Sequence, residues 1–447
     1  MDEYEVKDGV VIIPQGTATI KEGAFKHRLD IIKVIIPASV RIIGDCAFQG
    51  CENLEEINIP DSVAKIGKKA FYECKSLKKI HLPDSIVEID IWAFNDCSSL
   101  IEINIPPLLE KTPESFLSGC TSIKEITIPS TIKEINSSTF ARCTALEKIE
   151  LPDSITSIQS CAFSGCIKLR ECIIPDGITT IKSRTFENCE SLTHVRIPDS
   201  VTEIYAGAFK NCKSLKEIQL PSGLTKISTS LEGGAFSYSG LEHITIPDTV
   251  VTLGYSVFYG CKDLKDVKLS NSLTKIEDHL FGLCSSIEKI EIPSSVKIIK
   301  SNGFGGCSSM EEINIPGSVE EIEDHAFSHC KNVNKVSIPE SVKKIGEFAF
   351  DCKPVTLEIL SPITIREVWG LDLSETKTLV LGKGIRKFTD FFFYDRNNEI
   401  VKNLEVIYVP AKKSNYYKSR IPQELHKLIK ELSPENIHSS KEIDESA

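Results

Sequence analysis

The 447-residue chain is 41% hydrophobic and 26% charged, a composition typical of folded, water-soluble proteins. Its net charge of -11 argues against nucleic-acid binding, which needs a clustered basic surface. No stretch approaches the roughly 18 apolar residues of a membrane span, and the acidic start MDEYEVKDGVVIIP lacks the pattern of a signal peptide. We therefore expect a cytoplasmic protein with no membrane span.

A repeat with a period of about 23 residues organises most of the chain. Its clearest copy is LEEINIPDSVAKIGKKAFYEC, residues 54–74. Prolines recur at one fixed interval from Pro14 to Pro221, and after one longer step to Pro247 the interval returns and runs to Pro362. Ser270 takes one proline position, which gives 16 coils. A fixed period predicts an array that grows in one direction, in place of separate globular cores.

Each repeat predicts one β-strand followed by turns. The Ile-x-Ile before each proline has the period of two that a strand needs, and the proline ends the strand because it lacks an N–H. One strand per coil, always in the same direction, predicts a long parallel sheet. The hydroxyl two positions after the proline, as in Ser62, is expected to hydrogen-bond the turn backbone. The following Ala-Phe-x-x-Cys predicts a short helical turn with a buried column of phenylalanines.

The repeat is interrupted twice and then decays. Residues 107–113 shift the phenylalanine by one position, to Phe116, and three extra residues near SLEGGAF should bulge on the outer side. Residues 1–362 are predicted to form the solenoid, with the first coil as its N-terminal cap. Residues 363–432 should hold degenerate coils, with weak strands near 378–382 and 404–410, and a cap helix over 422–432, because Leu425, Leu428, Ile429 and Leu432 share one helical face. Residues 433–447 should be a flexible polar tail.

The cysteines follow the same period. A disulfide framework and a metal ladder are possible alternatives, but Cβ atoms in neighbouring coils would be parallel rather than facing and no CxxC is present. Buried free thiols are therefore favoured. Cys46 and Cys161 lie in a different, half-exposed column. Twelve of the 16 cysteines share one position of the repeat: Cys51, Cys74, Cys97, Cys120, Cys143, Cys166, Cys189, Cys212, Cys261, Cys284, Cys307 and Cys330.

The consensus LxxIxIPxSVxxIGxxAFxxC, over residues 10–362, resembles the BspA-like leucine-rich repeat. This resemblance implies an α/β repeat solenoid, a leucine-rich-repeat arc with its parallel sheet on the concave side. The ending LEVIYVPAKKSNYYKSRIPQELHKLIKEL resembles the cap of one bacterial subgroup, which implies a C-terminal helical cap. Members of the family have been linked to adhesion to host matrix proteins or other cells. The resemblance supplies no catalytic residues.

The outward strand positions on the expected concave side are the candidate binding residues. Their charges are mixed and aromatic residues are absent, so the surface could bind a protein or could simply be solvated. They are Lys33, Glu56, Asn58, Lys79, His81, Glu102, Asn104, Glu125, Lys148, Glu150, Glu171, His194, Arg196, Glu217, Gln219, His243, Asp266, Lys268, Lys289, Glu291, Glu312, Asn314 and Lys335.

These patterns favour a non-enzymatic, monomeric scaffold that binds a protein partner through the concave strand face, with no cofactor and no nucleic acid. The alternative is a cell-surface adhesin. An enzyme with its site in residues 363–447 is disfavoured, because that segment shows no pairing of a nucleophile with a base. His325 and His329 have metal-ligand spacing, but the glutamate of an HExxH motif is missing, so we expect no metal.

Overall fold

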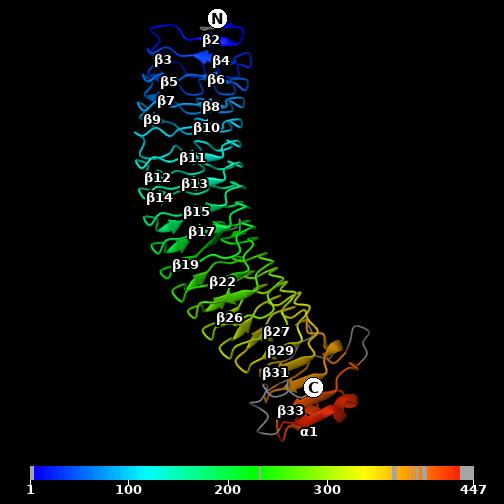
Figure 1. Cartoon of the computed structure of the whole chain (residues 1–447). Coiled ribbons are helices and arrows are strands. Elements are labelled where there is room, and N and C mark those ends of the chain that lie inside the picture. Colours follow the sequence, from blue (N-terminus) through cyan, green and yellow to red (C-terminus); the bar gives the residue numbers. More distant parts are fainter. Residues whose placement is uncertain are drawn as a thin grey trace. The chain divides into compact units, whose positions relative to one another are not determined.

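A computed structural model describes residues 5–230, 233–364, 370–383, 385, 387–388, 392–394 and 400–432. The chain forms two compact units, residues 1–241 and 242–447. Within each unit, coils of the predicted length stack in chain order (Figure 1). The predicted repeat solenoid is therefore confirmed.

The first ladder consists of the strands that precede the proline positions and, after Pro362, of the strands that continue the same sheet. Neighbouring strands pair in parallel with partners one repeat apart, such as Lys33 with Glu56 and Glu125 with Lys148. In unit 1 these strands are β2 (Val10–Ile12), β4 (Lys33–Ile35), β6 (Glu56–Ile57), β8 (Lys79–Ile80), β10 (Glu102–Ile103), β11 (Glu125–Thr127), β13 (Lys148–Glu150), β15 (Glu171–Ile173) and β17 (His194–Arg196). In unit 2 they are β22 (His243–Thr245), β24 (Asp266–Lys268), β27 (Glu312–Asn314), β29 (Lys335–Ile338), β31 (Thr356–Ile359), β32 (Thr378–Leu381), β33 (Val406–Val409) and β34 (Ile429–Glu431).

A second ladder follows most of the proline positions, so the prediction of one strand per coil was incomplete. Its short strands form at Val-x-x-Ile, where the isoleucine points into the core. In unit 1 they are β3 (Thr19–Ile20), β5 (Ile42–Ile43), β7 (Lys65–Ile66), β9 (Glu88–Ile89), β12 (Glu134–Ile135), β14 (Ser157–Ile158), β16 (Thr180–Ile181), β18 (Glu203–Ile204) and β19 (Lys226–Ile227). In unit 2 they are β23 (Thr252–Leu253), β25 (Lys275–Ile276), β26 (Ile298–Ile299), β28 (Glu321–Ile322) and β30 (Lys344–Ile345).

The Ala-Phe-x-x-Cys segment forms tight turns, and the short helical turn predicted there was wrong. The residues two before and two after the phenylalanine adopt left-handed backbone, as at Trp92 and Asp96 with φ of 59° each. This geometry directs the backbone N–H and carbonyl groups of each turn toward the neighbouring coils. In the first coil, the N–H of Phe25 donates to the carbonyl of Ala47 at 2.8 Å, and that of His27 donates to Gln49 at 2.7 Å. Neighbouring coils therefore share a third set of backbone hydrogen bonds.

The phenylalanine column forms the core, as predicted. Phe71 and Phe94 are fully buried, and their rings stack at 4.9 Å between centroids. The shifted coil is an exception, because Phe116 meets Phe94 edge-on at 85°. Leu117 takes the regular position there, since its N–H donates to the carbonyl of Thr139 in the next coil.

Part of the hydroxyl column behaves as predicted, whereas the hydroxyl oxygens of Ser295 and Ser341 are buried and have no hydrogen-bond partner among the described residues. The hydroxyl of Ser62 donates to the carbonyl of Val40 in the preceding coil at 2.6 Å, and Ser85 repeats this contact with Val63 at 2.8 Å. The bonds link one turn to the next and satisfy its backbone carbonyl.

The N-terminal edge is closed by a hairpin. The strand β1 (Val6–Lys7) pairs antiparallel with β2, and Asp8 and Gly9 between them have φ of 49° and 78°. Two positive φ values are typical of the type I′ turn that suits a hairpin. The hairpin covers the edge of the first ladder, which would otherwise present unpaired groups. A second hairpin, β20 (Thr229–Ser230) with β21 (Gly233–Gly234), forms at the three-residue insertion.

The predicted helical cap over 422–432 was wrong, and so was the α/β class. Helix in the described residues is confined to η2 (Leu373–Glu375), α1 (Ser414–Lys418) and η3 (Gln423–Leu428). Residues 429–431 instead form β34, which pairs in parallel with β33. An open sheet edge offers unpaired backbone groups, and pairing with it satisfies this segment better than a short isolated helix would. The predicted tail, 433–447, lies outside the described residues.

Candidate functional site

All the predicted binding residues lie on the outward side of the first ladder, and each is exposed or partly exposed. Side chains alternate between the two faces of a strand, so the inward isoleucines fix the direction of the residues between them. Seven of them are also exposed or partly exposed but lie outside the assigned strands: Asn58, His81, Asn104, Glu217, Gln219, Lys289 and Glu291. We call this set of outward side chains the first-ladder face.

Many charges on this face pair with one another across coils. Lys33 lies 2.6 Å from Glu56, and Lys79 lies 2.6 Å from Glu102. Each lysine lowers the pKa of the glutamate that it contacts, chiefly through the hydrogen bond. Exposed pairs of this kind contribute little to stability. The face therefore carries charges of both signs side by side.

Two of the predicted binding residues hydrogen-bond the backbone of the preceding coil. The side-chain amide of Asn104 accepts a hydrogen bond from the N–H of Leu82 at 2.7 Å and donates one to its carbonyl, also at 2.7 Å. Asn58 makes the same pair of contacts with Ile36. Both asparagines follow two-residue strands, where the backbone ladder stops. Their amides extend the ladder by one step.

The surface of the face is shallow. One open depression on it is about 440 Å³, and its lining includes Lys33, Glu56, Asn58 and Lys79. Small-molecule and catalytic sites are usually concave, mostly apolar clefts. A shallow polar depression is more suited to contact with a macromolecule.

The repeat geometry agrees with a comparison against known families. The model for the BspA type leucine rich repeat region matches residues 18–147, 134–232 and 229–356. The chain belongs to this family. Its coils are therefore BspA-type repeats.

The chain is also similar to solved structures of leucine-rich repeat proteins. A leucine-rich repeat protein from Bacteroides ovatus ATCC 8483 is 28% identical, with a TM-score of 0.65 over 84% of this chain and 92% of its own. A leucine-rich repeat protein from Eubacterium ventriosum ATCC 27560 is 20% identical, with a TM-score of 0.47 over 78% of this chain and 91% of its own. The comparison with curated proteins returned no match.

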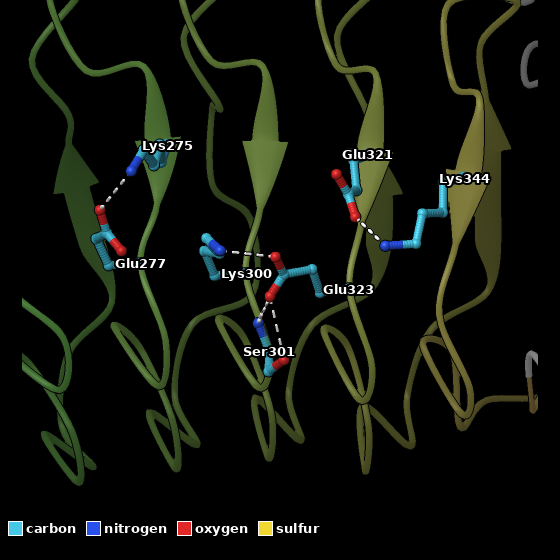
Figure 2. Close-up of polar contacts among 7 residues, drawn as sticks. All are labelled: Lys275, Glu277, Lys300, Ser301, Glu321, Glu323 and Lys344. Carbon is cyan, nitrogen blue, oxygen red and sulfur yellow. Dashed lines mark hydrogen bonds and ion pairs between the residues drawn. The ribbon is translucent and has the colours of Figure 1, made fainter.

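The second ladder of the BspA-type repeats carries a polar face that sequence reasoning missed. In unit 2, Lys300 and Glu323 point toward one another from neighbouring coils, 2.7 Å apart (Figure 2). Glu323 also accepts hydrogen bonds from the backbone N–H and the hydroxyl of Ser301, at 3.2 Å each. Glu321 pairs with Lys344 in the next coil. Opposite charges one repeat apart are the sequence signal for such pairs.

The thiols form an internal ladder, as expected of buried free cysteines. All 16 are free, and those of the main column are buried. Cys97 donates to the carbonyl of Phe71 in the preceding coil at 3.1 Å, and burial raises the pKa of the Cys97 thiol to about 12. A buried, protonated thiol is a poor nucleophile. Cys46 and Cys161 are only partly buried.

The described residues were also compared with the requirements of a metal site and of a membrane span. His329 lies 2.9 Å from Asp351, but no group of three potential metal ligands occurs among the described residues. No helix in that part of the chain is long and apolar enough to cross a membrane.

Proposed function

We propose that this BspA-type repeat protein is a non-enzymatic scaffold that binds a protein partner through the first-ladder face. The observation that carries the proposal is the regular spacing of outward side chains on stacked parallel strands. Glu102, Glu125 and Lys148 occupy the same position in three successive coils of unit 1.

The backbone supports rigid presentation of these residues. Within unit 1, neighbouring coils are bonded through the first ladder, the second ladder and the turns. A rigid surface loses little conformational entropy when it binds. Extended, mixed-charge surfaces of this kind are how repeat solenoids contact large partners.

The test is affinity capture with a charge-reversed face. The variant Glu102→Lys, Glu125→Lys, Lys148→Glu should lose partners that the natural chain retains, because each reversed charge would meet a like charge on the partner. Capture should be run from the organism's own extract, with bound proteins identified by mass spectrometry.

The matched control reverses exposed charges of the second ladder and its flank, in Glu88→Lys, Glu110→Lys, Lys133→Glu. This variant undergoes the same change in net charge and should retain its partners. Equal retention by both variants would exclude the first-ladder face. Equal loss in both would indicate an effect of overall charge.

The cytoplasmic location stays a prediction, and cell fractionation tests it. Recovery in the soluble internal fraction would agree with an internal scaffold. Recovery at the cell surface, accessible to added protease on intact cells, would favour the alternative role as an adhesin.

A further inference from the structure

A cluster of positive charges lies on the turn between β33 and η3, in the last coils of unit 2. This turn includes the short helix α1. Residues 411–420 hold no acidic side chain and four exposed basic ones, Lys412, Lys413, Lys418 and Arg420. We call these four residues the basic cluster.

The basic cluster lacks the pairing that is common on the rest of unit 2. Exposed lysines there pair with carboxylates of a neighbouring coil, as Lys343 does with Glu320. Among the described residues, none of the four cations of the cluster forms an ion pair. Their positive charge is therefore left without an opposite charge by the coils that the structure describes.

Two of the cations are held in place by Tyr416. The guanidinium carbon of Arg420 lies 3.7 Å from the centroid of the Tyr416 ring, and the ammonium of Lys413 lies 5.4 Å from it. The Tyr416 hydroxyl donates to the carbonyl of Ile385 in the preceding coil at 2.7 Å. The cluster is therefore presented on an ordered turn, which reduces the conformational entropy lost on binding.

The chain returns to this turn before it reaches residue 433. The carboxylate of Glu431 in β34 accepts hydrogen bonds from the N–H groups of Lys412 at 3.0 Å and Ser414 at 3.2 Å. Backbone pairing continues one residue beyond β34, since the N–H of Leu432 donates to the carbonyl of Val409 at 2.8 Å. Residue 433 therefore starts beside the basic cluster.

The segment that follows has the opposite charge. Residues 433–447 lie outside the described residues, and we call them the acidic segment. Four negative charges and one positive give it a net charge of -3, from Glu435, Glu442, Asp444, Glu445 and Lys441. A segment tethered beside its site has an effective concentration of roughly millimolar. Three residues span about 10 Å, so Glu435 can reach the cluster directly.

We propose that the acidic segment docks on the basic cluster of its own chain, through ion pairs between its carboxylates and the four cations. The segment supplies the last coils with the opposite charge that a neighbouring coil supplies elsewhere. It also shields the cluster from external anionic partners. This contact is independent of the partner binding proposed for the first-ladder face.

Cross-linking of the full chain with a water-soluble carbodiimide tests the contact directly. The reagent joins an ammonium to a carboxylate that touches it, and mass spectrometry of a digest identifies the pairs. In low salt, the acidic segment should cross-link to Lys412, Lys413 and Lys418 within one chain. Lys427 and Lys430 are the matched controls, because they are exposed and nearer in sequence, and they should cross-link less often.

Charge reversal tests whether opposite charge holds the segment. Proteinase K should cleave between residues 433 and 447 about threefold faster or more when either side is reversed, since docking protects the segment. The cluster is reversed in Lys412→Glu, Lys413→Glu, Lys418→Glu. The segment is reversed in Glu435→Lys, Glu442→Lys, Glu445→Lys. The two reversals combined should restore the slow rate of the natural chain.

Two controls separate docking from overall charge. The first reverses three exposed lysines of other coils and should leave the cleavage rate unchanged, in Lys262→Glu, Lys297→Glu, Lys331→Glu. The second adds salt to about 0.5 M, which screens exposed charges and should bring the natural chain to the fast rate. Circular dichroism shows that each variant is folded before its rate is compared.

Three results would overturn the proposal. The first is cross-linking of the segment to Lys427 and Lys430 as often as to the basic cluster. The second is a combined reversal that is cleaved as fast as either reversal alone, or a natural chain that is cleaved as fast as both. The third is cross-links found only between two chains, which would place the segment on a second copy.

Discussion

The thiol of Cys97 donates a hydrogen bond to the carbonyl oxygen of Phe71 in the preceding coil, 3.1 Å away. Cys74 bonds Phe48 in the same way, and in unit 2 Cys284 bonds Phe258. The position requires a side chain small enough for the core and able to donate one hydrogen bond. Cysteine meets both conditions, and this explains its recurrence without a disulfide or a metal.

Replacing a cysteine of the main column should therefore reduce the stability of the fold by more than the loss of side-chain volume alone would. We expect Cys97→Ala to destabilise the chain by about 0.5–1.5 kcal/mol more than Cys172→Ala. Both side chains are buried, and both substitutions remove one sulfur atom. Cys172 serves as the comparison because it lies in the strand column that isoleucine and valine otherwise occupy. Urea unfolding followed by circular dichroism measures both. Equal losses of stability would show that the thiol hydrogen bond contributes nothing.

The buried thiols should also make the protein sensitive to alkali. Burial raises the pKa of Cys97 from 9.0 to about 12, and Cys51, Cys143 and Cys330 behave alike. Below pH 9 the thiol is protonated in both the folded and the unfolded chain. Above it the unfolded chain loses the proton first, so stability falls until the folded pKa is reached. At about pH 10 each such thiol should favour unfolding by about 1.4 kcal/mol relative to neutral pH.

Urea unfolding between about pH 8 and pH 10, with a reducing agent present, measures this loss. In Cys97→Ala, the difference in bound protons between the folded and the unfolded chain should be smaller by about one, so the free energy of unfolding should fall less steeply as the pH rises. A free energy of unfolding that stays constant across this range would contradict the assignment of protonated, buried thiols.

The sequence predicted those parts of the fold that repeat. Proline spacing and the Ile-x-Ile pattern give the first ladder, because inward residues such as Val34 and Ile57 must alternate with outward ones. The second ladder was missed, since a two-residue strand such as Lys65–Ile66 is too short to show a period. The cap helix was predicted from the spacing of apolar residues such as Leu425 and Leu428. A local pattern cannot show that the edge of β33 is open and that pairing with it is the better solution.

The outward placement of the candidate residues was predicted to the same extent, and their role in binding stays a prediction. The alternation gave the outward direction of Lys33 and Glu56 correctly. It could not show that Asn58 and Asn104 bond the preceding coil, because that depends on where the backbone ladder stops. Neither could it give the turn geometry, since left-handed backbone at residues such as Trp92 is set by contacts between coils.

The asparagines of the first ladder should differ in their effects on stability. Asn104→Ala should cost about 1–2 kcal/mol, because the N–H and carbonyl of Leu82 lose both partners. Asn314 occupies the same position of its own repeat, but its side-chain amide donates to the side chain of Glu312, at 3.0 Å, so Asn314→Ala should change stability by less than about 0.5 kcal/mol. Thermal and urea unfolding compare the two variants. Equal costs would mean that the amide of Asn104 does not extend the ladder.

The two glutamates of one coil on the second ladder should also differ. Glu323 is partly buried and accepts from Lys300 and from both donors of Ser301, so Glu323→Ala should cost about 1–3 kcal/mol by leaving these groups without partners. Glu321 forms an ion pair with Lys344, whose side chain is well exposed. Because exposed ion pairs contribute little, Glu321→Ala should reduce stability by at most about 1 kcal/mol. Urea unfolding at low and high salt measures both, and the smaller effect should decrease further with salt because exposed charges are screened. Similar costs with similar salt dependence would mean that the contacts to Ser301 add nothing to the link between these coils.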